Sequence, residues 1–413
     1  MKNCALFLLL FAILGGCRKD QETVTITFAV GKDPAGYHQE LIRQFESLHP
    51  HTRVKLLEMP ESATQQHNSY VTYLSSRDPS IDVYSIDIIW PSEFGAAGWL
   101  HPLDRHFTAE ELSDFLPGPL RGCTYEGTLF AIPWFTDAGI LYYRQDLLDK
   151  EGLGVPETWG DLVEQAKTLQ SKYEIYGYVF QAQQYEGLIC NFLEYAWANG
   201  GGVLNGANIS IDSPKTIEAL QFMVDLVHLH RLTPEGVTTY KEEDSRQLFT
   251  EGRAAFMRNW PYAWALAQST EKGSKVAGKV GIAPLPHPAG GIPAACLGGW
   301  NLAVSRFSEH PSEAVVFVKF LTSYEVQKVF ALEGGRLPTN KTLYVDEEVL
   351  ERNPHYADLY QAFINALPRP VTPFYSKLSD VLQIEVHQAL IRTKTPRDAL
   401  RAAKEEMEAI LAD

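Results

Sequence analysis

An alternation of strand and helix patterns near the N-terminus constrains the fold of this chain more than any other feature. Residues 23–30 alternate apolar and polar side chains as a half-buried strand does, and residues 41–48 repeat apolar side chains at helical spacing. Residues 53–59 predict a second strand, residues 62–76 a polar helix, and residues 82–89 a third, mostly apolar strand. This order is typical of a parallel sheet with crossover helices, so we predict an α/β fold.

A second series of helical patterns begins beyond Leu129. Thr158 is a predicted N-cap with Asp161 three residues later, and Ser213 before Pro214 is another. Further helices are predicted from Pro311, over residues 376–391 and over residues 396–411. A chain of 413 residues is too long for one ordinary core, and it has no internal repeat and no low-complexity linker. We therefore expect two lobes between which the chain crosses more than once.

The N-terminus resembles a secretory signal. Lys2 precedes an apolar stretch from Ala5 to Gly16, which is too short to span a bilayer comfortably. The sequence Leu-Gly-Gly before Cys17 resembles a bacterial lipobox, in which the cysteine is lipidated and becomes the first mature residue. An ordinary cleaved signal with an incidental cysteine is the alternative. In both cases residues 1–16 lie outside the fold, and we expect a protein of the periplasm or of the outer face of the cell membrane.

Charge and cysteine content exclude several classes of protein. The formal net charge of −15 argues against a nucleic-acid partner, because phosphate binding needs clustered Lys and Arg. After residue 17 there is no second long apolar run that would span a membrane. The remaining cysteines, Cys123, Cys190 and Cys296, permit at most one disulfide and lack the paired spacing of a zinc site. We interpret them as mostly buried small apolar residues.

No motif of a common enzyme class is present. The chain lacks a Gly-x-Ser-x-Gly elbow, a Walker loop, a Gly-x-Gly-x-x-Gly after a strand and a His-Glu-x-x-His pair. We therefore expect no catalytic activity, no cofactor and no metal site. One enzymatic alternative stays open: Asp87 and Asp137 would suit the two carboxylates of a secreted glycoside hydrolase.

Aromatic residues beside carboxylates indicate a site for a sugar. Carboxylates and Arg bind sugar hydroxyls through charge-assisted hydrogen bonds, while aromatic rings cover the C–H faces. Asp87 lies near the end of the predicted strand 82–89, which gives way to Pro91, and Asp137 follows Ile-Pro-Trp-Phe-Thr. Trp260 and Tyr262 flank a proline, and Trp300 follows two glycines. Loops at strand carboxyl ends are where open parallel sheets bind ligands.

Seven segments, in order along most of the mature chain, are similar to those of the extracellular solute-binding proteins (family 1) of ABC sugar importers. The nearest branch is that of the trehalose- and maltose-binding members. The matching segments are residues 82–90, 97–104, 137–144, 184–187, 258–264, 297–300 and 368–373.

The resemblance implies a type II periplasmic-binding-protein fold, in which two α/β lobes, each a mostly parallel sheet flanked by helices, close on a hinge over a sugar. It implies that Asp87 and Asp137 accept hydrogen bonds from sugar hydroxyls and that Arg369 donates them, with a structural ion pair as the alternative role of Arg369. Trp260, Tyr262 and Trp300 would stack on or wall the rings. The backbone at Gly298 and Gly299 would allow close approach.

Two positions depart from the disaccharide-binding relatives. Those relatives tend to carry an acidic residue soon after the first strand, where this chain has a shortened turn from Asp33 to Gly36. They also tend to place Arg on the helix after the second strand, where this chain has His67 between Gln66 and Asn68. We expect Asp33 and His67 to lie near one sugar ring, with trehalose as the leading ligand.

The resemblance also implies an organisation and a set of partners. The first lobe would comprise residues 17–132 and 286–338, and the second lobe residues 133–285 and 339–413, with hinge crossings near Pro133, Pro284–Pro286 and Pro338. The protein would be a monomer that is lipid-anchored at Cys17 and captures an α-linked disaccharide such as trehalose or maltose. It would deliver that sugar to the membrane subunits of an ABC permease. A purely structural surface lipoprotein, which binds no sugar, is the remaining alternative.

Overall fold

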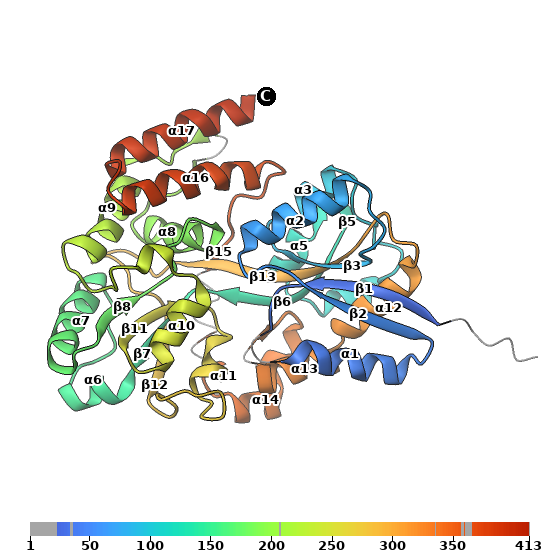
Figure 1. Ribbon diagram of the computed structural model, residues 1–413, viewed down its shortest axis with the longest axis horizontal. Helices are drawn as coiled ribbons and strands as arrows, with labels where there is room; N and C mark the ends of the chain where they lie inside the picture. The colour runs from blue at the N-terminus through green and yellow to red at the C-terminus, as the bar shows by residue number, and fades with distance from the viewer. Residues whose placement is uncertain are drawn as a thin grey trace, which may run out of the picture.

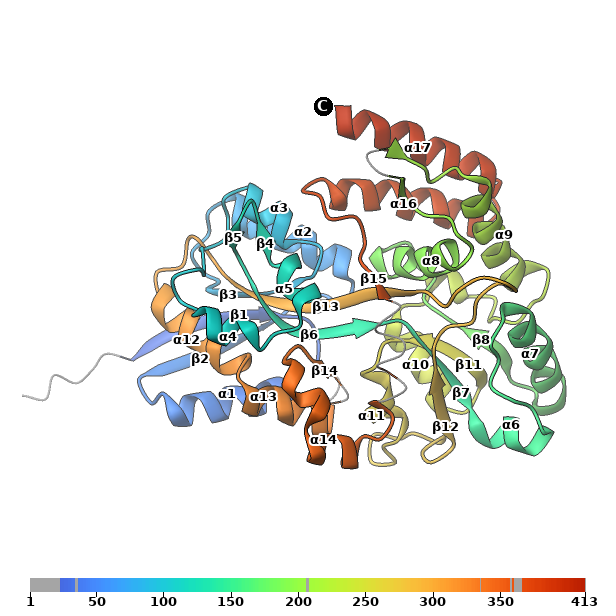
Figure 2. The same ribbon diagram turned by 180° about the vertical axis from the view of Figure 1, so that it is seen from behind.

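The computed structural model describes residues 23–33, 36–205, 208–334, 336–356, 359 and 366–412. The predicted signal at residues 1–16 and the predicted lipidation site Cys17 lie outside these residues. The chain forms two α/β lobes side by side, and strands β6 and β13 run between them through the middle of the molecule (Figure 1). The view from behind shows helices covering both lobes on their outer faces (Figure 2).

The first lobe is built on a seven-stranded sheet with the order β14-β6-β13-β3-β1-β2, in which β15 also pairs with β13. Its core joins strands β1 and β3 to helices α1 and α12. The strands are β1 Val24–Val30, β2 Thr52–Glu58, β3 Val83–Asp87, β6 Ile132–Ala138, β13 Ala295–Val304, β14 Leu337–Pro338 and β15 Ala366–Leu367. The flanking helices are α1 Tyr37–Leu48, α2 Ala63–Ser75, α3 Pro91–Ala96, α4 Ala109–Ser113, α5 Pro117–Gly122, α12 Pro311–Leu321 and α13 Tyr324–Val329, with a π-helical turn at Phe330–Gly334 and the hairpin β4 Thr124–Tyr125 and β5 Thr128–Leu129.

The second lobe is built on a four-stranded sheet with the order β12-β7-β11-β8. Its strands are β7 Ile140–Arg144, β8 Tyr176–Val179, β11 Ala254–Asn259 and β12 Val280–Ala283, with a separate pair of β9 Leu204–Asn205 and β10 Asn208–Ile209. Its helices are α6 Gln145–Glu151, α7 Trp159–Tyr173, α8 Glu186–Ala198, α9 Pro214–His228, α10 Glu242–Thr250, α11 Ala263–Ala267, α16 Tyr375–Leu390 and α17 Pro396–Ala412. Helix α14 Glu347–Arg352 and the 3-10 turns Val237–Thr239 and Lys341–Val345 complete the described elements.

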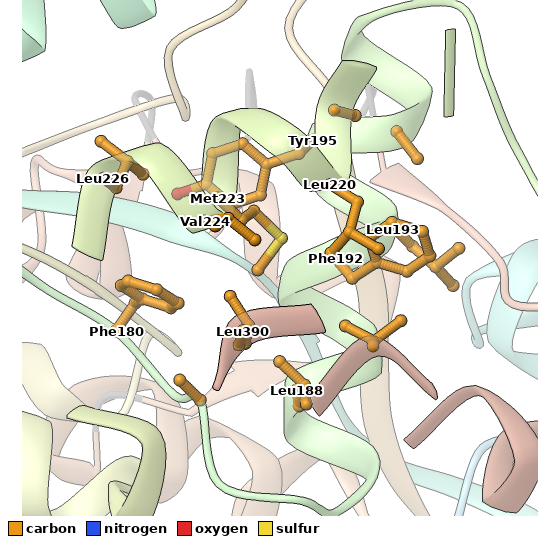
Figure 3. Close-up of a cluster of buried hydrophobic side chains, with 14 of the residues drawn as sticks. Phe180, Leu188, Phe192, Leu193, Tyr195, Leu220, Met223, Val224, Leu226 and Leu390 are labelled. Carbon is orange, nitrogen blue, oxygen red and sulfur yellow. The ribbon is translucent and has the colours of Figure 1, made fainter. Parts of the chain in front are cut away.

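Buried apolar side chains hold the second lobe together. Helices α8, α9 and α16 meet in a cluster that includes Phe192, Met223 and Leu390 (Figure 3). These side chains are essentially inaccessible to solvent. Each buried side chain of this size contributes about 1.5–3 kcal/mol by leaving water. The two C-terminal helices are therefore part of the second lobe.

The predicted α/β architecture is confirmed, but the expectation that each sheet is mostly parallel is wrong. The first sheet has three parallel and three antiparallel pairings. In the second sheet only β11 and β8 pair in parallel. The cause is the chain's return between lobes, because β13 re-enters the first sheet antiparallel to both β3 and β6.

The local signals for helix ends are confirmed. Thr158 and Asp161 form a reciprocal capping box at the start of α7. The Ser213 side chain accepts a hydrogen bond from the backbone N–H of Thr216 at the start of α9, with Pro214 at the first helical position. The predicted helices 376–391 and 396–411 match α16 and α17 to within one residue at each end.

The chain passes between the two sheets at several places. Strand β6 ends at Ala138 and β7 begins at Ile140, so Gly139 joins the first sheet to the second. Pro133 lies within β6, residues 284–286 directly follow β12, and Pro338 ends β14. The exact division of residues 17–413 between the lobes, and the hinge itself, stay predictions.

None of the helices that the structure describes is both long enough and apolar enough to cross a membrane. Cys123, Cys190 and Cys296 are free thiols in the interior.

Candidate functional site

A cavity of about 540 Å³ lies between the two lobes. Strands β3, β6 and β13 of the first sheet and the N-terminal ends of α8 and α10 of the second lobe supply its walls. The volume falls within the range of about 300–1,000 Å³ that is typical of small-molecule sites. Nine of the ten predicted ligand-binding residues line it: Asp33, Asp87, Asp137, Trp260, Tyr262, Gly298, Gly299, Trp300 and Arg369.

Aromatic rings form part of the cavity wall, and their polar edges are held by the second lobe. The Trp260 Nε1–H donates to Glu242 Oε1 at 3.2 Å, while the Arg258 guanidinium lies 4.0 Å from the centre of the indole ring. The Tyr262 hydroxyl donates to Glu243 Oε1 at 2.7 Å. Trp260 and Tyr262 are partly exposed. They therefore offer fixed, half-buried ring surfaces to the cavity.

Asp137 is a buried carboxylate that lacks a hydrogen bond to one of its oxygens. Only 8% of the residue is exposed, and no donor among the described residues reaches its Oδ1 atom. Burial raises the pKa of Asp137 to about 7, although the positive charges of Arg336 and Arg258 oppose the shift. An unpaired buried acceptor costs free energy, so this carboxylate is suited to accept a hydrogen bond from a ligand.

Arg369 bridges the two lobes from the wall of the cavity. Its Nη2 atom lies 2.8 Å from Asp87 Oδ1 at the end of β3, and its Nη1 atom lies 2.7 Å from Glu186 Oε1 at the start of α8. All three side chains are at least nine-tenths buried. Arg369 therefore forms the structural ion pair that was its alternative predicted role. Its Nε–H has no partner among the described residues.

A second guanidinium, that of Arg336, occupies the first-lobe side of the cavity. It lies 4.4 Å from the centre of the Phe135 ring and 3.9 Å from an oxygen of Asp33. Burial, followed by the charge of Arg336, lowers the pKa of His38 to about 3, so His38 is neutral beside it. Asp33 accepts a hydrogen bond from the backbone N–H of His38 at 2.7 Å. Asp33, the acidic residue after β1, therefore faces the guanidinium of Arg336, which was not predicted from the sequence.

Gly298 and Gly299 are required by packing within the cavity wall. A Cβ atom on Gly298 would come within 2.9 Å of Cζ3 of Trp260. Gly299 has φ +134°, and a Cβ there would come within 2.6 Å of the Phe135 carbonyl oxygen. These glycines let β13 lie close to β6 and to the indole of Trp260.

His67 is the one predicted site residue that does not line the cavity. Its Nε2 atom lies 2.9 Å from Glu93 of α3 and 3.2 Å from the Ser376 hydroxyl of α16, and Ser376 also contacts Glu93. Its ring stacks on Phe94. Because α16 belongs to the second lobe, this cluster joins the lobes outside the cavity.

Other polar contacts join the lobes in the same way. Lys241 at the start of α10 pairs with Glu61 at 3.1 Å. The Thr64 hydroxyl of α2 accepts a hydrogen bond from the backbone N–H of Glu186 at 3.1 Å. These contacts hold the two lobes against one another in this structure.

Several cavity residues were missed by the sequence analysis. They include Glu61, Tyr185, Glu186, Glu242, Glu243 and Arg336. Glu186 could have been predicted, because residues 184–187 form one of the matching segments. It is the first residue of α8. Arg336 carries no comparable signal, because a single Arg after two glycines is typical of many surface turns.

The family is shown by comparison with known proteins. Residues 30–328 match the bacterial extracellular solute-binding protein family. The chain belongs to this family, and the resemblance found in the sequence is confirmed. Members are binding proteins, so the chain is a solute-binding protein and the alternative of a glycoside hydrolase is wrong.

Individual relatives cover nearly the whole chain. A probable ABC transporter-binding protein of Deinococcus radiodurans is 40% identical over 365 residues, which are 86% of each chain. The structure of maltose-bound MalE3 of T. maritima is 45% identical, covers 94% of this chain and 100% of its own, and superposes with a TM-score of 0.91. The GacH receptor of Streptomyces glaucescens, solved unliganded and with acarbose, is 25% identical, with a TM-score of 0.84 and coverage of 95% and 99%. The α/β periplasmic-binding-protein fold is thus confirmed.

Proposed function

We propose that this protein captures an α-linked disaccharide, trehalose or maltose, and delivers it to the membrane subunits of an ABC importer. The observation that carries the proposal is a single cavity between the lobes, walled by Trp260, Tyr262 and Trp300 and containing the unpaired carboxylate oxygen of Asp137. Aromatic faces and unpaired acceptors are what a ring with hydroxyl donors needs. No covalent step is involved.

Two relatives support the choice of an α-linked sugar. The MalE3 structure, which is 45% identical, is described as maltose-bound, and that of the GacH receptor as a complex with acarbose. Maltose as the ligand is consistent with the MalE3 structure. Trehalose rests on the resemblance found in the sequence, so both are candidates.

Binding would favour closure of the lobes. A sugar in the cavity contacts Asp137 from the first sheet and Trp260 from the second lobe at once. A ligand shifts a conformational equilibrium by its differential affinity for the two states, and contacts from both lobes exist only in the closed state. The closed form would be the one that the permease recognises.

Titration calorimetry with maltose, trehalose, maltotriose and the acyclic polyol mannitol tests the proposal. We expect saturable 1:1 binding of maltose or trehalose and weaker binding of mannitol. Trp260→Ala should weaken the preferred disaccharide by about 2 kcal/mol, which is roughly thirtyfold in Kd, because it removes a ring surface anchored by Glu242 and Arg258.

Trp197→Ala is the matched control, since Trp197 is a half-buried tryptophan on α8 that does not line the cavity. It should bind the sugar as the unmodified protein does. Failure of every sugar to bind or to raise the melting temperature would support a structural lipoprotein instead.

We further propose that Cys17 carries a lipid anchor. Replacing it, Cys17→Ser, should move the protein from the membrane fraction to the soluble fraction of expressing bacteria, because acyl chains supply the membrane affinity. Cys4→Ser, within the predicted signal, is the control and should leave the distribution unchanged. A Cys17→Ser protein that stays with the membrane would contradict the anchor while leaving sugar binding untouched.

A further inference from the structure

The cavity carries an excess of negative charge. Eight of its lining residues have a carboxyl group, whereas three have a permanently charged Lys or Arg side chain. His38 does not offset the difference, because burial keeps it neutral. A cavity of this kind repels a phosphate or carboxylate on a ligand and attracts a cation.

Most of these carboxylates are already satisfied by the protein. Asp87 and Glu186 share Arg369. Glu243 accepts three hydrogen bonds from Arg246. Glu61 pairs with Lys241 through Oε2, while its Oε1 atom has no donor among the described residues. They therefore have limited capacity to bind a further cation.

Asp137 forms no ion pair with any described residue, in contrast to the four carboxylates above. It is buried, and its Oδ1 atom accepts no hydrogen bond from any described residue. The two guanidinium groups near it are each committed elsewhere, since Arg258 forms a bidentate pair with Glu194 at 2.9 and 2.5 Å and Arg336 faces Asp33. Asp137 is thus a buried carboxylate of the cavity wall that forms no ion pair with any described residue and has one oxygen without a donor. Glu242 also forms no ion pair among these residues, but its two oxygens accept hydrogen bonds from the Tyr185 hydroxyl and the Trp260 indole.

We propose that the cavity prefers a disaccharide in which one hydroxyl is replaced by a basic amine, with the ammonium group at Asp137, over the neutral disaccharide, and that it rejects phosphorylated or uronic sugars. This inference rests on the proposed sugar-binding function and names the ligand class of the same site. An ammonium group donates charge-assisted hydrogen bonds, which are roughly twice as strong as neutral ones. It also supplies the counter-charge that a buried carboxylate lacks.

The preference depends on pH in a defined direction. The groups that act on Asp137 are Arg336, Arg258 and Asp87, together with the phenols of Tyr142 and Tyr344, whose pKa values are raised by burial so that both stay neutral. With a pKa of about 7, Asp137 is mostly protonated about one pH unit below that value and mostly ionised one unit above it. The amine preference should therefore grow as the pH rises through 7, until the amine itself loses its proton.

The experiment compares trehalose, or maltose if it binds more tightly, with its mono-aminodeoxy analogues, each carrying the amine at a different hydroxyl position, and with its 6-phosphate. Calorimetry on the full mature protein should show one analogue binding about tenfold more tightly than the parent sugar at about pH 8, with a smaller ratio at about pH 6. The 6-phosphate should not bind.

Two variants test whether Asp137 causes the preference for the amine. Asp137→Asn should weaken binding of the parent sugar and reduce the ratio of amine-analogue affinity to parent-sugar affinity to about one. Glu164→Gln removes an exposed carboxylate of α7 that does not line the cavity and should keep the ratio. The inference is wrong, and the proposed function stands, if the parent sugar binds and no analogue binds more tightly than it does. The same conclusion follows if the amine-to-parent affinity ratio is unchanged in Asp137→Asn. Absence of binding by all neutral sugars and all analogues overturns the proposed function and the inference together.

Discussion

Replacing Arg369 with alanine should lower the free energy of unfolding by about 3–5 kcal/mol, which is the usual cost of removing one member of a buried ion pair. The change leaves Asp87 and Glu186 buried without their shared cation. It also removes a contact that joins the two lobes at the cavity wall, so sugar affinity should fall as well. Urea denaturation with and without the sugar measures both effects.

Two further variants distinguish this account from a general loss of side-chain volume. Arg401→Ala removes an exposed arginine of α17 and should change stability by less than about 0.5 kcal/mol. Adding Asp87→Asn and Glu186→Gln to Arg369→Met removes the stranded charges and should recover part of the stability. If the triple variant were as unstable as Arg369→Ala, burial of unpaired charge would not be the cause.

Glu194→Ala should have an effect of similar size, about 3–5 kcal/mol, because Arg258 would keep its charge in the interior without a carboxylate. Both side chains are almost inaccessible, at 1% and 2% exposure, and Glu194 also accepts a hydrogen bond from the backbone N–H of Cys296. Arg258 lies over Trp260, so the ring that walls the cavity would lose its support. Chemical denaturation should show the loss of stability, and calorimetry a weaker affinity for the sugar.

The matched control for Glu194→Ala is Glu164→Ala, which removes an exposed carboxylate from α7 of the same lobe. Gly139→Ala provides an independent perturbation, since a Cβ at residue 139 would overlap the Glu194 carboxylate. Both Glu194→Ala and Gly139→Ala should destabilise the protein, while Glu164→Ala should not. Equal stability of Glu194→Ala and Glu164→Ala would contradict the importance of the pair.

Local patterns predicted the secondary structure well because the signals are themselves local. The strand predicted over residues 23–30 and the capping box at Thr158 depend on neighbours in sequence, and both are present, although Phe28, Ala29 and Val30 are all buried instead of alternating. Strand direction depends on where the chain returns. The antiparallel entry of β13 between β3 and β6 leaves no trace in its own residues, so the sheets were wrongly expected to be mostly parallel.

In the candidate site, too, local features were predicted from the sequence and long-range contacts were not. Carboxylates and aromatic rings beside turns, such as Asp137 and Trp300, were selected from the sequence, and the structure gathers them around one cavity. Arg336 was missed, because its proximity to Asp33 joins residues far apart in the chain. His67 was placed near the ligand by its position on the helix after β2. The helix turns that residue toward Glu93 and Ser376 instead, a contact that no local pattern encodes.

The polar contacts that join the lobes, such as Lys241 with Glu61 and Ser376 with Glu93, have a kinetic consequence. A sugar enclosed on both sides leaves only after the enclosing walls separate. Its residence time is then governed by the rate at which these contacts break, rather than by the strength of any one hydrogen bond to the sugar. A transporter that pulled the two halves apart would therefore control the moment of release without competing for the sugar directly.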